Sequence, residues 1–574
     1  MTETGRRAAI TGLLPLAIAG YLTAIASLLL HRGEWARWLG DESALTVMSR
    51  SALLEGAWLL AIFGIGTLLR RHQRFAELAP AVFWGLLAVA LLWLPPALLQ
   101  SSAVVDGLRH FWLIDDEMIS MTYARHLAEG QGLVWSAGER VEGFSNPAWT
   151  LLMAAVLLVA PLHIAPLVML LLSIGVGLAL VVLTQRLVRL LGGGDWAAAA
   201  SVALLVFAPY ALALASAGWE SVPLAGLTLW CLCRILEEHG KAPRLGTGLL
   251  LGLIATVRAD AATISLVLGL FWWLGSGQRG RAFAWGALGL LLPLAVLGFR
   301  LAYYGEWMSN TVVLKTANWP DRTATGLAYI KHYLKHLAPV LALALWAAWR
   351  QPRLAAAMIL TLAAALIAQT TLAGGDTFGH YRMLFPVLMP LVVLAFTGVE
   401  HGIQNFWLRL AAPLACLLAT SMILPGLLPR FGVVSPADAG NVRLALELKK
   451  HCGQDAVADF FAGTPFYYSG CRGVDLLGKM DRHVAALPVD AGSTHPGHNK
   501  FDYDWSLGRL KPALVVAPEP GSPTPAQLDD MAAEGWRYPL AFYGHPLFVQ
   551  HCAPYPIAAQ TWRTVYRCHW PATP

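Results

Sequence analysis

The chain has 574 residues, of which 57% are hydrophobic and only 13% are charged. A soluble globular protein carries about twice that charged fraction, because charged side chains cover its water-facing surface. The composition therefore excludes an ordinary soluble protein and indicates a polytopic membrane protein built of α-helices. The net charge of +6 does not require a nucleic acid, since membrane proteins carry excess Lys and Arg in their cytoplasmic loops.

Basic residues around the apolar segments predict how the chain is threaded through the membrane. Arg6 and Arg7 precede a first apolar run at residues 8–30, which is longer than a signal-peptide core and is expected to remain as a helix. Further spans are predicted near residues 51–69 and 83–99, with the N-terminus in the cytoplasm. Other basic clusters expected on the cytoplasmic side are Arg186/Arg189, Lys241/Arg244, Arg279/Arg281 and Arg350/Arg353.

Two apolar runs lie between Asp116, which is expected outside, and Arg186, which is expected inside, although only one crossing fits there. The shorter run, residues 147–160, is followed by Pro161 and falls below the about 20 residues that a full span needs. We expect a re-entrant or interfacial helix here, with a short true span as the alternative. Continuing the count predicts about thirteen crossings and a C-terminus on the outer face.

The composition changes near residue 431. Asp, His, Gly and Pro become frequent, no apolar run reaches spanning length, and β-rich runs such as PALVVAP alternate with helical runs such as VRLALELKK. The sequence therefore predicts a transmembrane module at residues 1–430, with a first acidic outer loop at 101–147. It predicts a soluble α/β domain on the outer face at residues 431–574.

Four of the seven cysteines lie in this predicted outer domain: Cys452, Cys471, Cys552 and Cys568. In an oxidising compartment they can form two disulfides in three different pairings, or they can be free buried thiols. The other three, Cys231, Cys233 and Cys416, lie in apolar segments and are predicted to be packing residues. No CxxC, HExxH or zinc-type spacing occurs, so the sequence indicates no metal site and no certain cofactor, while a divalent metal stays an open option.

Asp115 and Asp116 lie just past a membrane-length apolar segment, in the predicted first outer loop. Adjacent carboxylates repel each other, and charge near hydrocarbon is costly. A cap on the following helix would explain one of the two carboxylates but not both. A carboxylate can accept a proton from an acceptor hydroxyl or stabilise positive charge at a sugar, so both aspartates are candidate catalytic residues.

Further polar residues occur in segments that are predicted to face the same side as the two aspartates. They are Glu220, Arg258, Tyr304, Asn310, Lys315, Asp376, His380 and Arg382. Their cations can bind a phosphate leaving group. Structural interpretations also exist: Arg258 can pair with Asp260, Lys315 can be an ordinary loop lysine, and His380 and Arg382 can be interfacial anchors. The convergence of the set on one side favours a site for a phosphate and a sugar.

Outside the cytoplasm an activated sugar must arrive on a carrier that crosses the membrane. A polyprenyl phosphate is the simplest carrier that meets this requirement. The residues therefore predict a multi-pass inner-membrane glycosyltransferase that uses a polyprenyl-phosphate sugar donor at the periplasmic face. Its acceptor would be a cell-envelope glycan or glycoprotein. One alternative is a transporter or flippase of lipid-linked sugars, which would favour charges near the bilayer midplane and inverted repeats. Another is a ligase or polymerase that uses a diphosphate-linked donor.

Several blocks of the sequence are similar to a known family. They are DDEMISMTYARHLAEGQGLVWSAGERVEGFSNPAW, YYGEWMSNT, GGDTFGHYR, and VADFFAGTPFYYSGCRGVDLLGKMDRHVA followed by PGHNKFDYDW. As a set they resemble the terminal arabinofuranosyltransferases of mycobacterial-type cell walls and their bacterial relatives, within the GT-C superfamily of lipid-linked glycosyltransferases. The resemblance implies a catalytic carboxylate at Asp115 or Asp116 and D-arabinofuranose carried on decaprenyl or undecaprenyl phosphate. The chain departs from the family pattern at Arg258–Ala261, which reads Arg-Ala-Asp-Ala where relatives often read Arg-Pro-Glu-Gly.

Overall fold

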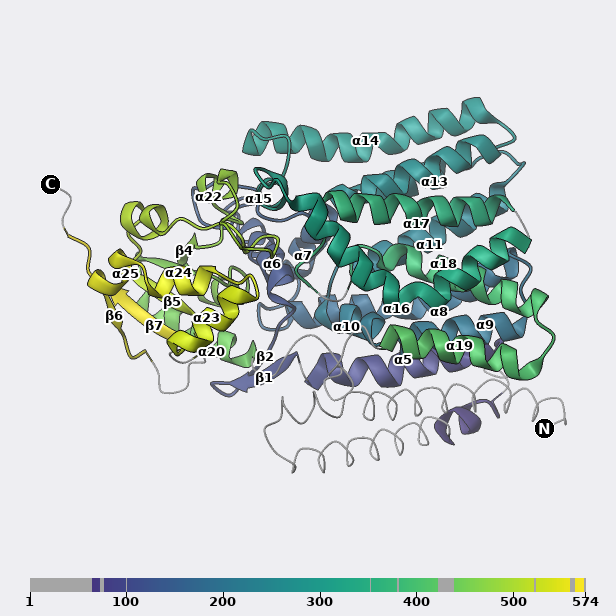
Figure 1. The fold of residues 1–574 in the computed structure, drawn as a ribbon, viewed down its shortest axis with the longest axis horizontal. Helices are drawn as coiled ribbons and strands as arrows, with labels where there is room; N and C mark the ends of the chain where they lie inside the picture. The colour runs from purple at the N-terminus through teal and green to yellow at the C-terminus, as the bar shows by residue number, and fades with distance from the viewer. Residues whose placement is uncertain are drawn as a thin grey trace.

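The computed structural model describes residues 64–72, 77–99, 101–350, 353–378, 381–421, 438–520, 523–557 and 563–571. Within these ranges the molecule has a part made of long helices, which run side by side along its longest axis, and an α/β part that covers one end of them (Figure 1). The first predicted span at residues 8–30, most of the second at 51–69 and the predicted boundary between residues 430 and 431 lie outside the described residues.

The helical part is built from apolar segments that end at Gly, Pro or charged residues. Its helices are α5 (Pro80–Leu99), α8 (Ala165–Leu190), α9 (Asp195–Phe207), α10 (Pro209–Ala217), α11 (Ser221–Glu238), α12 (Leu245–Val257), α13 (Ala262–Gly275), α14 (Arg279–Tyr304), α16 (Arg322–Arg350), α17 (Leu354–Leu372), α18 (Phe385–Gly402) and α19 (Phe406–Ser421). Helix α18 is central, whereas only 11% of the most apolar stretch of α14 is buried. A helix that exposes apolar side chains to this extent requires lipid around it.

Four of the described helices, α8, α14, α17 and α18, are long and apolar enough to cross a membrane. The pair α9 and α10, which is bent by 55°, makes a fifth candidate span if it is taken as one unit. The chain is therefore a multi-pass membrane protein, as the composition predicted. The total of about thirteen crossings stays a prediction, because the other described helices do not combine the length and the hydropathy of a full span.

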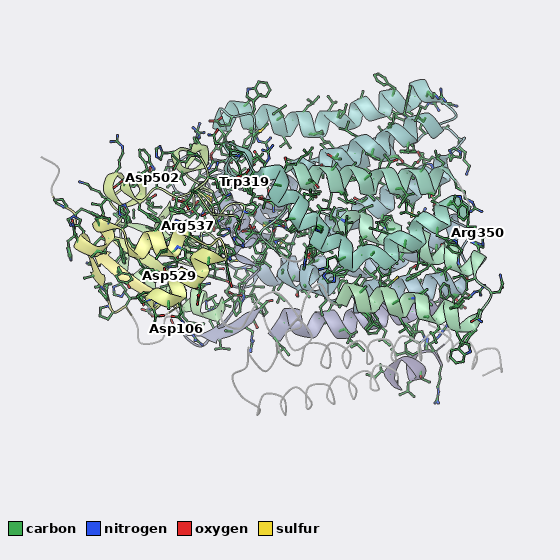
Figure 2. All side chains as sticks on the ribbon, in the orientation of Figure 1. Asp106, Trp319, Arg350, Asp502, Asp529 and Arg537 are labelled. Atoms are coloured by element: carbon green, nitrogen blue, oxygen red, sulfur yellow. A yellow bond between two sulfur atoms is a disulfide. The ribbon has the colours of Figure 1, made fainter. Side chains whose placement is uncertain are left out.

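One end of the helical part lies far from the α/β part, and the loops at that end are hydrogen-bonded to one another. The backbone amide of Gly240 donates to the carbonyl of Gly275, and Arg353 donates to the carbonyl of Leu191. Figure 1 shows the turn between α13 and α14 at this end, and Figure 2 shows Arg350 there, with the labelled residues of the α/β part at the opposite end. The four predicted cytoplasmic basic clusters from Arg186 onward therefore lie at one end of the helical part. This is expected if all four face the same side of the membrane.

The segment that follows α5 stays at the other end of the helical part. It contains two antiparallel strands and two helices: β1 (Ser102–Val105), β2 (Leu108–Phe111), α6 (Asp115–Ala128) and α7 (Pro147–Leu157). Just before α7, the carbonyl of Ser145 accepts from the amide of Ala259, and just after it the carbonyl of Leu162 accepts from the Tyr467 hydroxyl of the α/β part. Helix α7 thus begins and ends on the same side, which agrees with the re-entrant or interfacial helix predicted for residues 147–160.

The α/β part contains a five-stranded mixed sheet in the order β4-β3-β5-β7-β6, in which β3 is parallel to β4 and β5, and β7 is antiparallel to β5 and β6. The strands are β3 (Ala456–Asp459), β4 (Arg472–Asp475), β5 (Leu514–Pro520), β6 (Cys552–Pro554) and β7 (Arg563–Cys568). The helices are α20 (Ala439–His451), α21 (Thr464–Ser469), α22 (Arg482–Ala486), α23 (Pro525–Ala533), α24 (Tyr538–Tyr543) and α25 (Pro546–His551). The mixed α/β content follows the sequence pattern, while solubility and an outer location of this part stay predictions.

Two disulfides join the four cysteines of the α/β part. Cys452 pairs with Cys471, which links the end of α20 to the start of β4, and Cys552 pairs with Cys568, which links the neighbouring strands β6 and β7. The predicted disulfides are confirmed, and the alternative of four free thiols is wrong. Cys231, Cys233 and Cys416 are free and buried, as their apolar surroundings predicted.

One cluster of buried side chains is built by both parts of the molecule. Ile119 and Tyr123 of α6 and the following Trp135 pack with Leu448 of α20 and Phe466 of α21. The Trp135 indole also donates to the carbonyl of Ala462 at 2.8 Å. The α/β part is therefore docked onto the segment of residues 101–147 by a shared core, and this docking fixes the geometry of the junction.

Candidate functional site

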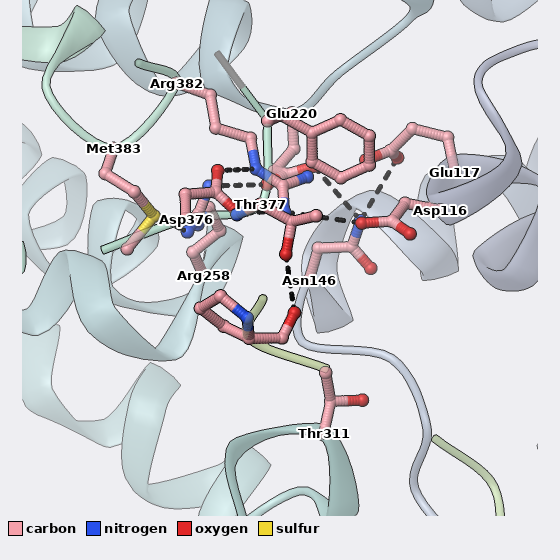
Figure 3. A network of polar contacts seen from close by, with 12 residues as sticks. Asp116, Glu117, Asn146, Glu220, Arg258, Thr311, Asp376, Thr377, Arg382 and Met383 are labelled. Carbon is pink, nitrogen blue, oxygen red and sulfur yellow. Dashed lines mark hydrogen bonds and ion pairs between the residues drawn. The ribbon is translucent and has the colours of Figure 1, made fainter. Parts of the chain in front are cut away.

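A cavity of about 190 Å³ lies where the helical part meets the α/β part. Six of the residues selected from the sequence line it: Asp116, Glu220, Arg258, Lys315, Asp376 and Arg382. They come from segments up to 266 residues apart in the chain. Figure 3 shows most of them around one polar network. The predicted convergence of these residues is therefore present in the structure.

Asp115 and Asp116 begin helix α6, where the positive end of the helix dipole favours carboxylates. Successive side chains on a helix diverge by about 100°, and the two aspartates point to different neighbours. Asp115 faces the α/β part and accepts hydrogen bonds from the backbone amides of Gly463 at 3.2 Å and Thr464 at 2.9 Å. Burial raises the pKa of Asp115 to about 6, against the opposing hydrogen bond from Thr464.

Asp116 faces the cavity, and one of its oxygens lies 3.3 Å from the Arg382 guanidinium. Burial alone would raise its pKa, but the positive charges of Arg382, Lys315 and Lys479 more than offset burial, so that the pKa of Asp116 is lowered. Asp116 is thus an ionised carboxylate at neutral pH. Of the two adjacent aspartates, it alone lines the cavity.

Arg382 is held by Asp376, whose carboxylate accepts from its Nε at 2.7 Å and from its Nη2 at 3.2 Å. The guanidinium also lies over the rings of Trp219 and Phe378, at 5.1 and 4.8 Å from their centroids. Burial alone would lower the pKa of Arg382, whereas the carboxylates of Asp376 and Asp116 raise it. Arg382 therefore stays charged and in a fixed orientation.

The glycine pair before Asp376 makes this arrangement sterically feasible. Gly374 and Gly375 both adopt left-handed backbone conformations, with φ of +91° and +83°. A Cβ would lie 2.7 Å from the Trp319 ring at the first position and 2.8 Å from Tyr329 at the second. Residues other than glycine would therefore clash here, and the AGGD motif turns the chain after α17 so that Asp376 reaches the cavity.

Arg258 follows the end of α12 in an extended conformation and pairs with two carboxylates. It donates to Glu220 at 2.8 Å and to Asp260 at 2.9 Å. The pairing of Arg258 with Asp260, which the sequence allowed as the structural alternative to phosphate binding, is present, and Glu220 is an additional partner that the sequence did not indicate. Each arginine of the cavity is thus balanced by two carboxylates.

A further carboxylate that lines the cavity, Glu117, lies beside Glu220 and was not singled out from the sequence. The Asn146 amide nitrogen contacts Glu117 at 3.2 Å and Glu220 at 3.4 Å (Figure 3). The Asn146 side-chain oxygen accepts from the hydroxyls of Ser120 and Thr150. Burial and the charge of Glu220 raise the pKa of Glu117. Burial alone would also raise the pKa of Glu220, but the neighbouring Glu117 and Arg258 lower it to about 2.

Two lysines line the cavity without a hydrogen bond or ion pair to any other described residue: Lys315 and Lys479. Lys315 belongs to the short helix α15 (Asn310–Thr316), and Lys479 lies in the loop between β4 and α22. Burial and the nearby Arg382 lower the pKa of Lys315. Lys479 was missed by the sequence analysis, because a lysine in the run LLGKMDR has no local feature that separates it from a solvated loop lysine.

The remaining predicted residues lie elsewhere. The Tyr304 hydroxyl donates to the carbonyl of Leu133 at 2.7 Å, and the Asn310 amide donates to carbonyls of the loop that carries Lys479. Neither side chain lines the cavity, and His380 lies outside the described residues. His498 of the α/β part is close enough to Asp116 for their charges to interact, and its Nδ1 is buried without a partner among the described residues.

No group of three or more His, Cys, Asp and Glu side chains in the described part of the chain is arranged to hold a metal ion. Four carboxylates that line the cavity, Asp116, Glu220, Asp260 and Asp376, are each paired with an arginine. The arrangement as a whole combines the ionised Asp116 with two lysines that have no partner among the described residues. It can therefore accept a proton and bind an anion at the same place.

Comparison with known proteins places this geometry in context. No family model matches the chain. The chain is 27% identical over 355 residues to the terminal β-(1→2)-arabinofuranosyltransferase of Mycobacterium tuberculosis, covering 55% of this chain and 53% of that protein. It is 26% identical over 358 residues to the enzyme of the same name from Corynebacterium glutamicum, covering 51% of this chain and 49% of that protein. The chain thus spans about half the length of the curated relatives it matches.

Among solved structures, ArnT from Cupriavidus metallidurans bound to undecaprenyl phosphate superimposes with a TM-score of 0.51 and 14% identity, over 84% of this chain and 97% of that one. At this level of identity the likeness shows a shared fold. The likeness to terminal arabinofuranosyltransferases, predicted from the sequence blocks, is confirmed by the two relatives.

Proposed function

We propose that the protein is a membrane glycosyltransferase that moves a sugar from a polyprenyl-phosphate donor to a hydroxyl group of a cell-envelope glycan or glycoprotein. The observation that carries this proposal is the ionised Asp116 in one cavity with Lys315, which has no partner among the described residues. A sugar transfer needs both groups, since a proton must leave the acceptor hydroxyl and negative charge must be stabilised on the departing phosphate.

In the proposed reaction Asp116 accepts the proton of the acceptor hydroxyl while the acceptor oxygen bonds to the anomeric carbon. The bond between that carbon and the phosphate oxygen breaks, and its electron pair leaves with the polyprenyl phosphate. Lys315 stabilises the negative charge of this leaving group. Arg382 holds Asp116 and Asp376 in place, and Arg258 does the same for Glu220 and Asp260.

Asp115 has a different place in the proposal. Its two oxygens are occupied by backbone amides of the α/β part, and its side chain does not line the cavity. We therefore assign Asp115 a positioning role, in which it fixes the start of α6 against the α/β part. This assignment separates two aspartates that the sequence leaves equivalent.

The identity of the sugar is supported by the names of the relatives in Mycobacterium tuberculosis and Corynebacterium glutamicum, which are arabinofuranosyltransferases. We propose D-arabinofuranose on decaprenyl or undecaprenyl phosphate as the donor. We further propose an inner-membrane location with a cytoplasmic N-terminus and a periplasmic α/β part. The cavity at one end of the helical part disfavours a transporter, whose charges would lie near the bilayer midplane.

The test is sugar transfer by the purified protein in detergent from synthetic polyprenyl-phosphate arabinose, with the diphosphate-linked sugar as a comparison donor. Asp116→Asn keeps the size of the side chain but cannot accept a proton, so we expect a loss of roughly 10²–10⁴ in rate. Asp115→Asn should lose far less. Thermal unfolding of each variant checks that it is folded. Near-normal transfer by a folded Asp116→Asn variant, or transfer only from the diphosphate donor, would overturn the proposal.

A further inference from the structure

The loop that carries Lys479 is held rigidly within the α/β part. The Asp475 carboxylate accepts from the backbone amides of Leu477 at 3.0 Å and Met480 at 2.8 Å. Gly478 has a φ of +79°, and a Cβ there would lie 2.6 Å from Val484. The backbone around Lys479 therefore has one well-defined course, and the lysine itself is only 7% exposed.

The same loop is anchored to the helical part by Asn310. The Asn310 amide nitrogen lies 2.9 Å from the carbonyl oxygens of both Gly478 and Lys479. Asn310 is the first residue of α15, the helix that also carries Lys315. One short helix thus supplies one cavity lysine and fixes the backbone of the other, so that the two ammonium groups are positioned relative to each other.

The lysines of the cavity differ from its arginines in their partners. Arg258 and Arg382 each face two carboxylates, whereas Lys315 and Lys479 have no hydrogen bond or ion pair among the described residues. Burying an ammonium group without a partner is costly, and a bound anion would remove that cost. A phosphodiester carries one negative charge, and the phosphate monoester that leaves after sugar transfer carries up to two. Two cations that lack protein partners in the described part of the chain match the charge that develops on such a leaving group.

We propose that Lys479 is a ligand of the donor phosphate, together with Lys315, and that the α/β part thereby completes the active site of the helical part. This inference rests on the proposed glycosyl transfer, because it assigns the phosphate of that donor to a specific pair of residues. Asn310 becomes a positioning residue for Lys479, which gives a role to a residue that does not line the cavity.

The experiment measures binding of dodecyl phosphate and of inorganic phosphate to the full-length protein in a neutral detergent, by the shift in thermal unfolding as the ligand is titrated. Charged hydrogen bonds to a phosphate account for about 10- to 100-fold in affinity, so we expect Lys479→Met to weaken dodecyl phosphate binding by that factor. Lys479→Arg should retain part of the affinity. Lys449→Met, which changes an exposed lysine of the same part, serves as the matched control and should bind like wild type.

Binding of both ligands through Lys479 would identify a site for the phosphate group itself, whereas binding of dodecyl phosphate alone would show that the alkyl chain contributes. Asn310→Ala is the second variant, which should weaken phosphate binding less than Lys479→Met and keeps the test valid if Lys479→Met does not fold. Equal affinity of wild type, Lys479→Met and Asn310→Ala would overturn the inference. Asp116→Asn should still bind phosphate, so that loss of transfer in that variant reports on the proposed reaction and not on Lys479.

Discussion

The helical part and the α/β part are stabilised in different ways. Helix α14 exposes Phe283, Leu291 and Leu294 along its length, so the order of this part depends on a lipid environment. The α/β part has a closed core around Ala458 and Phe542 and two disulfides of its own. The difference also extends to the cavity. The helical part supplies the arginines with their carboxylate partners and also Lys315, whereas the α/β part supplies Lys479; neither lysine has a partner among the described residues.

This contrast suggests that the two parts have different roles within one site. A cavity built only from balanced ion pairs is rigid but attracts anions weakly, because its positive charges are already satisfied. Added cations without carboxylate partners convert the same cavity into an anion site. The docking of the α/β part is therefore expected to control donor binding, while the helical part is expected to hold the residues for proton transfer.

The largest expected effect is a difference in compartment. The two ends of the helical part are expected to lie on opposite sides of the membrane. A reporter fused after Arg281, at the end that holds the basic clusters, should be active only in the cytoplasm. A reporter fused after Ala373, beside the cavity, should be active only in the periplasm. If both fusions report the same compartment, the proposed location of the α/β part and the lipid-linked donor are wrong.

The two disulfides allow a matched comparison within the α/β part. They close loops of similar length, with sequence separations of 19 and 16 residues, so removing either should cost about 2–5 kcal/mol of stability. Cys452 and Cys471 belong to the core shared with α6, whereas Cys552 and Cys568 lie at the far edge of the sheet.

The double change Cys452→Ser/Cys471→Ser should therefore also reduce sugar transfer, and Cys552→Ser/Cys568→Ser should leave transfer near wild type below its unfolding temperature. Thermal unfolding and transfer rate are measured on the same preparations. Equal loss of transfer in both double variants would show that the shared core does not set the geometry of the cavity.

The smallest expected effect concerns the pH dependence of the contact between Asp115 and the α/β part. The folded-state pKa of about 6 lies above the unfolded value of 3.8, so the folded protein binds an extra proton between these values. Asp115 therefore contributes about 1–3 kcal/mol to the free energy of unfolding at low pH, and this contribution is lost as the pH rises through about 6.

The measurement is thermal unfolding of wild type and Asp115→Asn at a series of pH values from about 4 to 8. The stability of wild type relative to the variant should fall as the pH rises through about 6 and stay level above it. A difference between the two proteins that does not change with pH would mean that Asp115 is not buried against Gly463 and Thr464 as described.

Several features of the site could be predicted from local sequence. Charged residues in apolar surroundings are few, and their sidedness follows from the basic clusters, so Asp116, Arg258, Asp376 and Arg382 could be selected from sequence position alone. The glycine pair before Asp376 signals a chain reversal in the same way. Lys479, Glu117 and Asn146 could not be selected, since each occurs in a segment where its residue type is ordinary.

Local sequence was sufficient to predict the class of protein, the α/β character of its C-terminal part, and several of the segments that face the cavity. These properties depend on composition and on periodicity over about 10–20 residues. Tertiary structure was needed to tell which aspartate faces the cavity, which cysteines pair and which lysines have no partner among the described residues. Those outcomes depend on how segments hundreds of residues apart dock onto one another, and a rotation of about 100° between adjacent helical residues is enough to give Asp115 and Asp116 different partners.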